Sequence, residues 1–213
     1  MMKYLFMIAI AGALFTSCGE KAKEMGQAMD NIKNIAENAE KVQAQQSDVQ
    51  KRRDERRAKG DTLAIPYKDL QAYLPASVNG YTAQEPTGES VNMMGMSYST
   101  CARRYTKQGA NGEESVEVTI MDYNSQAALY DGAIMIWGAG ITVDNDAETT
   151  KTLQTDLPYS AALEHYWKKE HRSEVTYALG GRFLLTIKAD NQSSIDFAKN
   201  VATSMKLAEL ANK

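Results

Sequence analysis

The chain contains 213 residues, of which 43% are hydrophobic and 24% are charged, with a formal net charge of −3. These proportions are those of an ordinary globular protein, and they exclude a collagen-like, a disulfide-dense or a multi-span membrane protein. The small negative charge also excludes a chain that binds nucleic acid through overall basicity, so we expect no nucleic-acid partner. The length allows one medium domain with attached segments, or two small domains.

The first 17 residues have the order of features of a secretory signal. Lys3 supplies a positive charge, residues 4–15 form an apolar run, and the small residues Thr16 and Ser17 follow. The apolar run has 12 residues. A helix of that length is too short to cross a hydrocarbon layer of about 30 Å. We therefore interpret residues 1–17 as a signal peptide rather than as part of the fold.

The end of this signal resembles the lipobox of bacterial lipoproteins. It reads Leu14, Phe15, Thr16, Ser17 and Cys18, whereas the family pattern usually has leucine where this chain has Phe15. The resemblance implies that Cys18 receives acyl chains, palmitate among them, and becomes the new N-terminus. Several chains would anchor the protein stably, because each buried methylene contributes about 0.8 kcal/mol. The alternative is an ordinary secretory signal that contains a cysteine.

The residue after Cys18 bears on the location of the protein. It is Gly19, and not the aspartate that resembles an inner-membrane retention signal, so the resemblance implies the outer membrane of a Gram-negative cell envelope. Lipidation of Cys18 would leave Cys101 as the only thiol, without a disulfide partner. We interpret Cys101 as a small buried residue of a strand.

Residues 21–59 are rich in helix-forming residues, with no proline and one glycine. Their apolar residues recur in steps of three and four, which is a heptad repeat interrupted by Gln46. A helix of this length spans roughly 55 to 60 Å. We expect residues 18–60 to form a lipid-anchored helical stalk, which either self-associates as a coiled coil or lies against the domain or the membrane. The members of the repeat are Met25, Ala28, Ile32, Ile35, Ala39, Val42 and Val49.

The stalk ends in a basic stretch, residues 51–59, in which six basic side chains outnumber two acidic ones. Such a stretch contacts anionic lipid headgroups in some proteins. The simpler interpretation, which we favour, is a solvated helix end with local charge pairs, because cations are stabilised near a helix C-terminus. Gly60 is then expected to end the helix.

Residues 61–213 are sufficient for one domain and show both helical and strand patterns. The signals Asn111-Gly112 and Gly180-Gly181 predict tight hairpins. The fold class we predict is α+β, with the long N-terminal helix followed by an antiparallel sheet packed with helices. The expected helices are residues 67–74, 125–137 and 195–207, the expected strands are 80–85, 94–107, 115–123, 151–155, 159–168, 172–179 and 182–189, and residues 144–150 are expected to form a loop.

This order of elements resembles that of small bacterial envelope domains of unknown function, which are themselves similar to the PsbP family of extrinsic photosystem proteins. The resemblance covers about residues 67–207 and includes the turn formed by Leu179, Gly180, Gly181, Arg182 and Phe183. It implies a non-catalytic accessory role. It carries over no functional residue.

The sharpest ligand hypothesis concerns a methionine cluster. Met94 and Met96 would lie on one face of a strand, close to Met93 and upstream of Cys101. Thioether ligands select Cu(I), so these two methionines are candidate metal ligands. Methionines fill gaps in protein cores more often than they bind copper, and we favour that second interpretation.

Other candidate residues do not converge on a site. His165 is expected opposite Glu174 on a hairpin and His171 beside its turn, so the two histidines would not meet. Arg103 and Arg104 would point to opposite faces of a strand. Motifs for zinc, phosphate or nucleophilic catalysis are missing from the sequence. We predict no catalytic residue and no cofactor.

Three functions remain open at the level of sequence. The first, which we favour, is a lipid-anchored envelope protein with a non-catalytic interaction or accessory domain. The second is a periplasmic or surface carrier, for which a deep apolar pocket would be expected for a small apolar ligand or a metal. The third is a hydrolase with a dispersed site, which would need a cleft with convergent ionisable groups.

Overall fold

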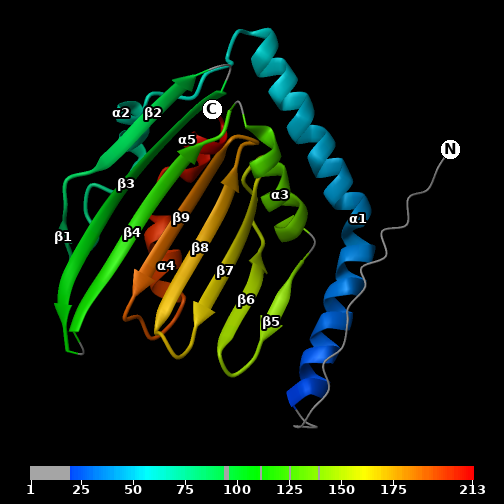
Figure 1. Ribbon diagram of the computed structural model, residues 1–213, viewed down its shortest axis with the longest axis vertical. Helices are drawn as coiled ribbons and strands as arrows, with labels where there is room; N and C mark the ends of the chain where they lie inside the picture. Colours follow the sequence, from blue (N-terminus) through cyan, green and yellow to red (C-terminus); the bar gives the residue numbers. More distant parts are fainter. Residues whose placement is uncertain (1–19, 94–95, 111, 125, 139) are drawn as a thin grey trace.

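A computed structural model describes residues 20–93, 96–110, 112–124, 126–138 and 140–213 (Figure 1). The signal peptide, Cys18 and Met94 lie outside these residues. None of the helices in the described ranges is both long and apolar enough to span a membrane.

Within the described residues, nine strands form one antiparallel sheet. The strand order is β1-β3-β4-β9-β8-β7-β6-β5, and β2 pairs with β3 beside β1. The strands are β1 (Thr82–Ala83), β2 (Thr87–Met93), β3 (Met96–Gly109), β4 (Gly112–Asp122), β5 (Thr142–Asp144), β6 (Glu148–Leu153), β7 (Ala161–Trp167), β8 (Arg172–Leu179) and β9 (Phe183–Asp190).

Helices pack on both faces of the sheet (Figure 1). The long helix α1 and the shorter α3 lie on one face, and α2, α4 and α5 lie on the other. The helices are α1 (Glu20–Ala58), α2 (Tyr67–Leu70), which continues as a 3-10 turn over Gln71–Tyr73, α3 (Ala127–Gly138), α4 (Asp196–Thr203) and α5 (Leu207–Ala211).

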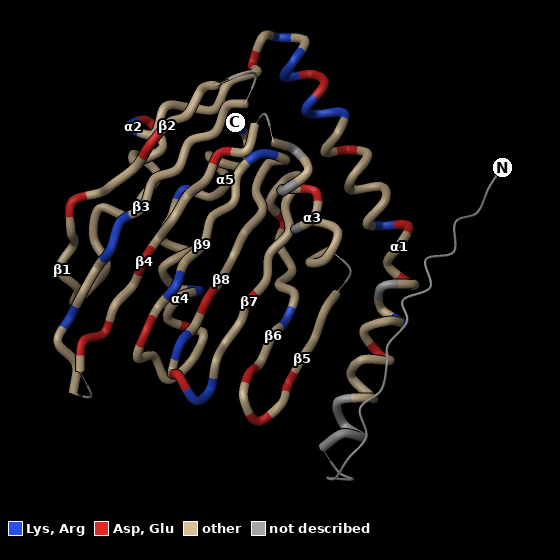
Figure 2. The backbone as a smooth tube through the Cα atoms, viewed as in Figure 1, with Lys and Arg blue, Asp and Glu red and all other residues tan. Residues whose placement is uncertain are grey.

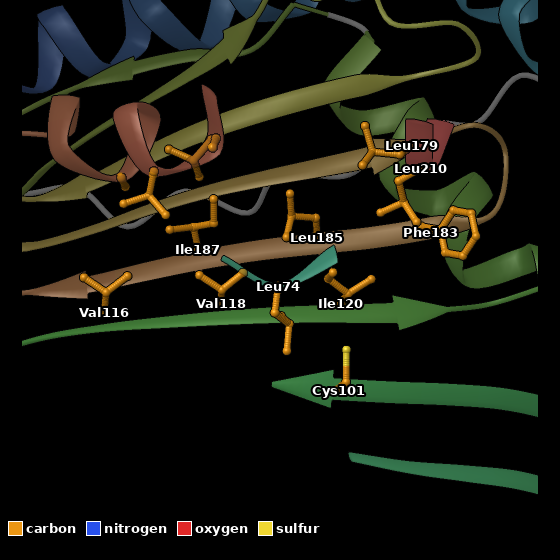
Figure 3. Close-up of a cluster of buried hydrophobic side chains, with 14 of the residues drawn as sticks. Leu74, Cys101, Val116, Val118, Ile120, Leu179, Phe183, Leu185, Ile187 and Leu210 are labelled. Atoms are coloured by element: carbon orange, nitrogen blue, oxygen red, sulfur yellow. The ribbon is translucent and has the colours of Figure 1, made fainter. Parts of the chain in front are cut away.

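The main core lies between the sheet and α2, α4 and α5. Val116, Val118 and Ile120 alternate along β4 and are fully buried, as the two-residue period of a strand requires. Leu185 and Ile187 of β9 lie beside them in the close-up of Figure 3. A smaller cluster on the opposite face joins Tyr130 and Ile134 of α3 to Val49 of α1, Ala161 and Ala178.

The expected fold class is wrong. The described residues form mainly one antiparallel sheet, and the helices that follow α1 have only 4 to 12 residues. Strands occur where the sequence predicts none (β2, β5) or a loop (the first part of β6), because these segments are fixed by pairing with neighbouring strands rather than by their own alternation. The helix expected over residues 195–207 is divided between α4 and α5.

Helix α1 is not a stalk that stands apart from the domain. Its first half contacts the edge strand β5 and its second half packs against α3 (Figure 1). The heptad positions consequently lie in two environments: Met25, Ala28, Ile32 and Ala39 are exposed, whereas Val42 and Val49 are buried.

The contact between α1 and β5 is made by amide side chains. Gln27 accepts a hydrogen bond from the backbone N–H of Asp144 (3.1 Å) and donates one to its carbonyl oxygen (2.8 Å). Asn31 does the same at Thr142, with distances of 3.0 and 2.9 Å. Four helical residues rise about 6 Å, close to the spacing of alternate residues in a strand. The two amides therefore take the place of a further strand and satisfy the edge of the sheet.

The basic end of α1 is also only partly solvated. Figure 2 shows Lys and Arg concentrated in the last turns of this helix. Arg57 pairs with Asp54 at 3.6 Å, as expected for a solvated helix end. Arg53 and Arg56, however, are buried against the domain, so the expectation of a fully solvated helix end is wrong for these two residues.

Candidate functional site

The turn between β8 and β9 binds the C-terminal part of α1 through hydrogen bonds. Gly180 and Gly181 have φ values of 62° and 73°, a conformation that glycine adopts without a steric penalty. Their carbonyl oxygens point to α1, where Arg56 donates to Gly180 (3.1 Å) and Arg53 donates to Gly181 (3.1 Å). Arg53 also donates to Asp131 of α3 at 2.7 Å, which fixes the helix at both sides of the turn.

The next residue, Arg182, holds the start of the domain against the end of the sheet. Its guanidinium makes two hydrogen bonds to the carboxylate of Asp122, at 2.9 and 2.8 Å, and one to Asp61 at 2.8 Å. Asp122 is completely buried and also accepts hydrogen bonds from the backbone N–H groups of Ile65 (2.7 Å) and Asn124 (3.0 Å). A buried carboxylate is stable only when its oxygens are paired and hydrogen-bonded. Because one of these donors is Ile65, the bonds to Asp122 hold the segment that follows α1 in place.

That segment forms one wall of a cleft of about 670 Å³. The cleft lies at the end of the molecule where α1 ends and where α2, α5 and the C-terminus gather (Figure 1). Its opposite wall is α5, where Glu209 accepts a hydrogen bond from Tyr73 (3.2 Å) and pairs with Lys206 (4.0 Å). Residues that line it include Asp61, Leu63, Lys68, Tyr73, Lys206 and Glu209.

The cleft is mixed in character, with charged side chains of both signs beside the apolar Leu63, Ile65 and Pro66. Asp61 is held by Arg182, and Glu209 by Tyr73 and Lys206, while Lys68 adds a further exposed cation. Such a cleft is suited to a polar or zwitterionic surface of a partner. It is not the deep apolar pocket expected for a carrier of an apolar ligand.

Burial is the main cause of several shifted pKa values in the molecule. Desolvation, followed by the nearby charges of Arg182 and Arg52, lowers the pKa of Arg56 to about 10. Burial raises the pKa of the Cys101 thiol to about 12 and that of Tyr105 to about 12. Cys101 is therefore a neutral thiol in the main core, as a structural residue should be, and not an activated nucleophile.

The structure brings the methionine cluster together only in part. Met93 and Met96 are paired in register at the ends of β2 and β3, and both are exposed. Cys101 lies five positions further along β3, on the opposite face of the sheet, so it does not join them. Met94 is outside the described residues, and binding of Cu(I) stays a prediction.

The histidines lie as the hairpin pattern predicts. His165 is opposite Glu174, and His171 lies in the β7–β8 turn with φ 50°. His165 is hydrogen-bonded to Glu148 at 2.7 Å and stacks on Trp167, with 3.6 Å between ring centroids. The described residues contain no group of three or more His, Cys, Asp or Glu side chains that could hold a metal ion.

Sequence reasoning missed the residues that organise this end of the molecule. Arg53, Arg56 and Arg182 belong to no functional motif, and the two carboxylates that bind Arg182, Asp61 and Asp122, are 121 and 60 residues from it in the chain. One signal was available, because Val49, Arg53 and Arg56 are spaced to share a face of a helix. That spacing predicts that both arginines point the same way as a core residue.

Comparisons with protein-family models, curated proteins and solved structures found no match. The resemblance to lipoproteins and to PsbP-like envelope domains therefore rests on the sequence features alone, and it enters the functional interpretation as a proposal.

Proposed function

We propose that this protein is a lipid-anchored protein of the cell envelope, in the outer membrane of a Gram-negative bacterium, with a non-catalytic binding domain. In this proposal, lipid on Cys18 holds α1 at the membrane, and α1 holds the domain in a fixed position. The observation that carries the proposal is that α1 begins at Glu20, two residues after Cys18, and is clamped to the domain by Arg53 and Arg56.

Because Arg53 and Arg56 hold α1 against the domain, the proposed anchor also determines where the cleft lies relative to the membrane. Helix α1 has 39 residues. At 1.5 Å per residue its length is about 58 Å. The cleft lies at the end of this helix opposite to Glu20. An anchor at Cys18 would therefore hold the cleft remote from the point of attachment and open to a partner in the aqueous space.

Substitution of Cys18 tests the anchor. We expect the wild-type protein to incorporate labelled palmitate and to sediment with membranes, and Cys18→Ala to lose the label, because the acyl chains need this thiol. The matched control is Cys101→Ala, which makes the same change at the buried cysteine and should keep both the label and the membrane fraction. Labelling of Cys18→Ala, or no labelling of the wild type, would refute the proposed lipidation.

A further inference from the structure

Helix α1 carries an apolar stripe that the domain does not cover. Met25, Met29 and Ile32 are 67, 68 and 61% exposed, the highest values among the large hydrophobic residues described. They recur at intervals of four and three residues and therefore share one face of the helix. We call this face, with the exposed Ala28, Ala36 and Ala39, the outer stripe.

The opposite side of the same half of α1 is polar and occupied. Gln27 and Asn31 are bonded to β5, and Asn34 donates to the carbonyl oxygen of Gly140 at 3.4 Å. Rotating the helix to bury the outer stripe would break these bonds and leave edge groups of the sheet without partners. The stripe is therefore fixed facing away from the domain.

The outer stripe is restricted to the half of α1 nearest Cys18. Along the same face, the second half of the helix presents the exposed polar residues Gln43, Ser47, Gln50 and Asp54. The face of α1 that contacts the domain, which we call the inner face, changes in the opposite sense. It carries the amides of Gln27 and Asn31 in the first half of the helix and the buried Val42 and Val49 in the second half. The polarity of α1 thus reverses along its length. On the face that points away from the domain, only the first half of the helix is apolar and suited to contact with an apolar environment.

We propose that the outer stripe lies on the surface of the lipid bilayer. This inference rests on the lipidation of Cys18 proposed above. Met25 is seven residues after Cys18. Met25 also lies five residues after Glu20, where α1 begins, a rise of about 7.5 Å, so the stripe begins close to the proposed point of attachment. An interfacial helix buries its apolar face at the boundary of headgroups and acyl chains while its other face stays polar, which is the division that α1 has here.

This placement determines how the molecule sits at the membrane. The sheet, which contacts the inner face of α1, lies on the water side, and the acyl chains and the stripe give two separate points of attachment. Two membrane signals hold a protein far better than one. The cleft, at the other end of α1, stays outside the bilayer.

Lipid-borne quenchers distinguish the outer stripe from the polar part of the same face. The full-length lipidated chain is reconstituted in phosphatidylethanolamine–phosphatidylglycerol vesicles that carry a spin label in the acyl region. An environment-sensitive fluorophore is attached through Met29→Cys, or, as the matched control, through Gln50→Cys. We expect quenching at residue 29 to be at least about threefold stronger than at residue 50, because only the apolar half enters the acyl boundary.

Equal, weak quenching at both positions would overturn the inference. A second result would also overturn it. If the fluorophore at residue 29 reports an apolar environment in protein without vesicles as the protein concentration rises, the stripe is covered by a second copy of the chain. Flotation of the same samples separates this outcome from failure of the anchor. Vesicles that carry the protein but do not quench residue 29 refute the stripe alone, whereas protein that does not float refutes the lipid anchor.

Discussion

Arg182→Met is expected to lower the free energy of unfolding by about 3–5 kcal/mol, because it removes one partner of a buried ion pair. Asp122 is completely buried and receives two of its hydrogen bonds from Arg182. The same substitution removes one partner of Asp61, which keeps Asn124 at 3.0 Å, and so weakens the wall of the cleft that follows α1. Urea unfolding measures the loss, provided that the slope of the transition is unchanged.

Two variants show whether the loss comes from the stranded carboxylate. Arg182→Met with Asp122→Asn should recover part of the stability, because the remaining amide is neutral. Lys188→Met removes a cation from β9, the strand that follows Arg182, where Lys188 and Glu174 are 3.8 Å apart and partly exposed. This control should cost no more than about 1 kcal/mol. A loss for Arg182→Met no larger than that of Lys188→Met would contradict the account.

Gly180→Ala is expected to destabilise the protein by about 2–4 kcal/mol through strain and collision together. The residue has φ 62°, and a Cβ atom there would lie 2.3 Å from the carbonyl oxygen of Ala211 at the end of α5. Backbone at that distance cannot yield as a flexible side chain can. The turn or α5 must therefore move. Movement of the turn also displaces the carbonyl oxygens of Gly180 and Gly181, which accept hydrogen bonds from Arg56 and Arg53.

Gly60→Ala separates the two causes. Gly60 also has a positive φ, 83°, but no atom lies within 4 Å of the position of its Cβ. Gly60→Ala should lower the free energy of unfolding only by the conformational cost of a positive φ at alanine, about 1 kcal/mol. Thermal unfolding of the two variants gives the difference directly. If both lose the same stability, α5 does not pack on the β8–β9 turn as described.

The local part of the fold could be predicted from the sequence. Strand β8 spans the predicted residues 172–179, and the turn at Gly180 and Gly181 lies where the Gly-Gly signal places it, because alternation and turn chemistry are properties of neighbouring residues. Strand β5 could not be predicted in this way. It has three residues, and its pairing partners are β6 and two amides of α1 more than 100 residues earlier in the chain.

The candidate site was less predictable than the fold. The cleft is built from the segment after α1, the β8–β9 turn and α5, which come together only in the folded chain. The burial of Arg53 was hidden because its partners, a backbone carbonyl and Asp131, carry no sequence signal. The apolar heptad on α1 was visible, but periodicity alone does not say which face a domain covers, and here polar amides face inward.

Hydrogen exchange at β5 tests most directly the central claim that α1 is fixed along the domain. The N–H groups of Thr142 and Asp144 lie at the edge of the sheet, where they donate to the side-chain oxygens of Asn31 and Gln27, respectively. Both should exchange slowly in the wild type. Asn31→Ala should accelerate exchange at Thr142 by about two- to tenfold, the equivalent of one lost hydrogen bond, with a smaller effect at Asp144. Exchange at the unprotected rate in the wild type, unchanged by Asn31→Ala, would contradict the docking of α1.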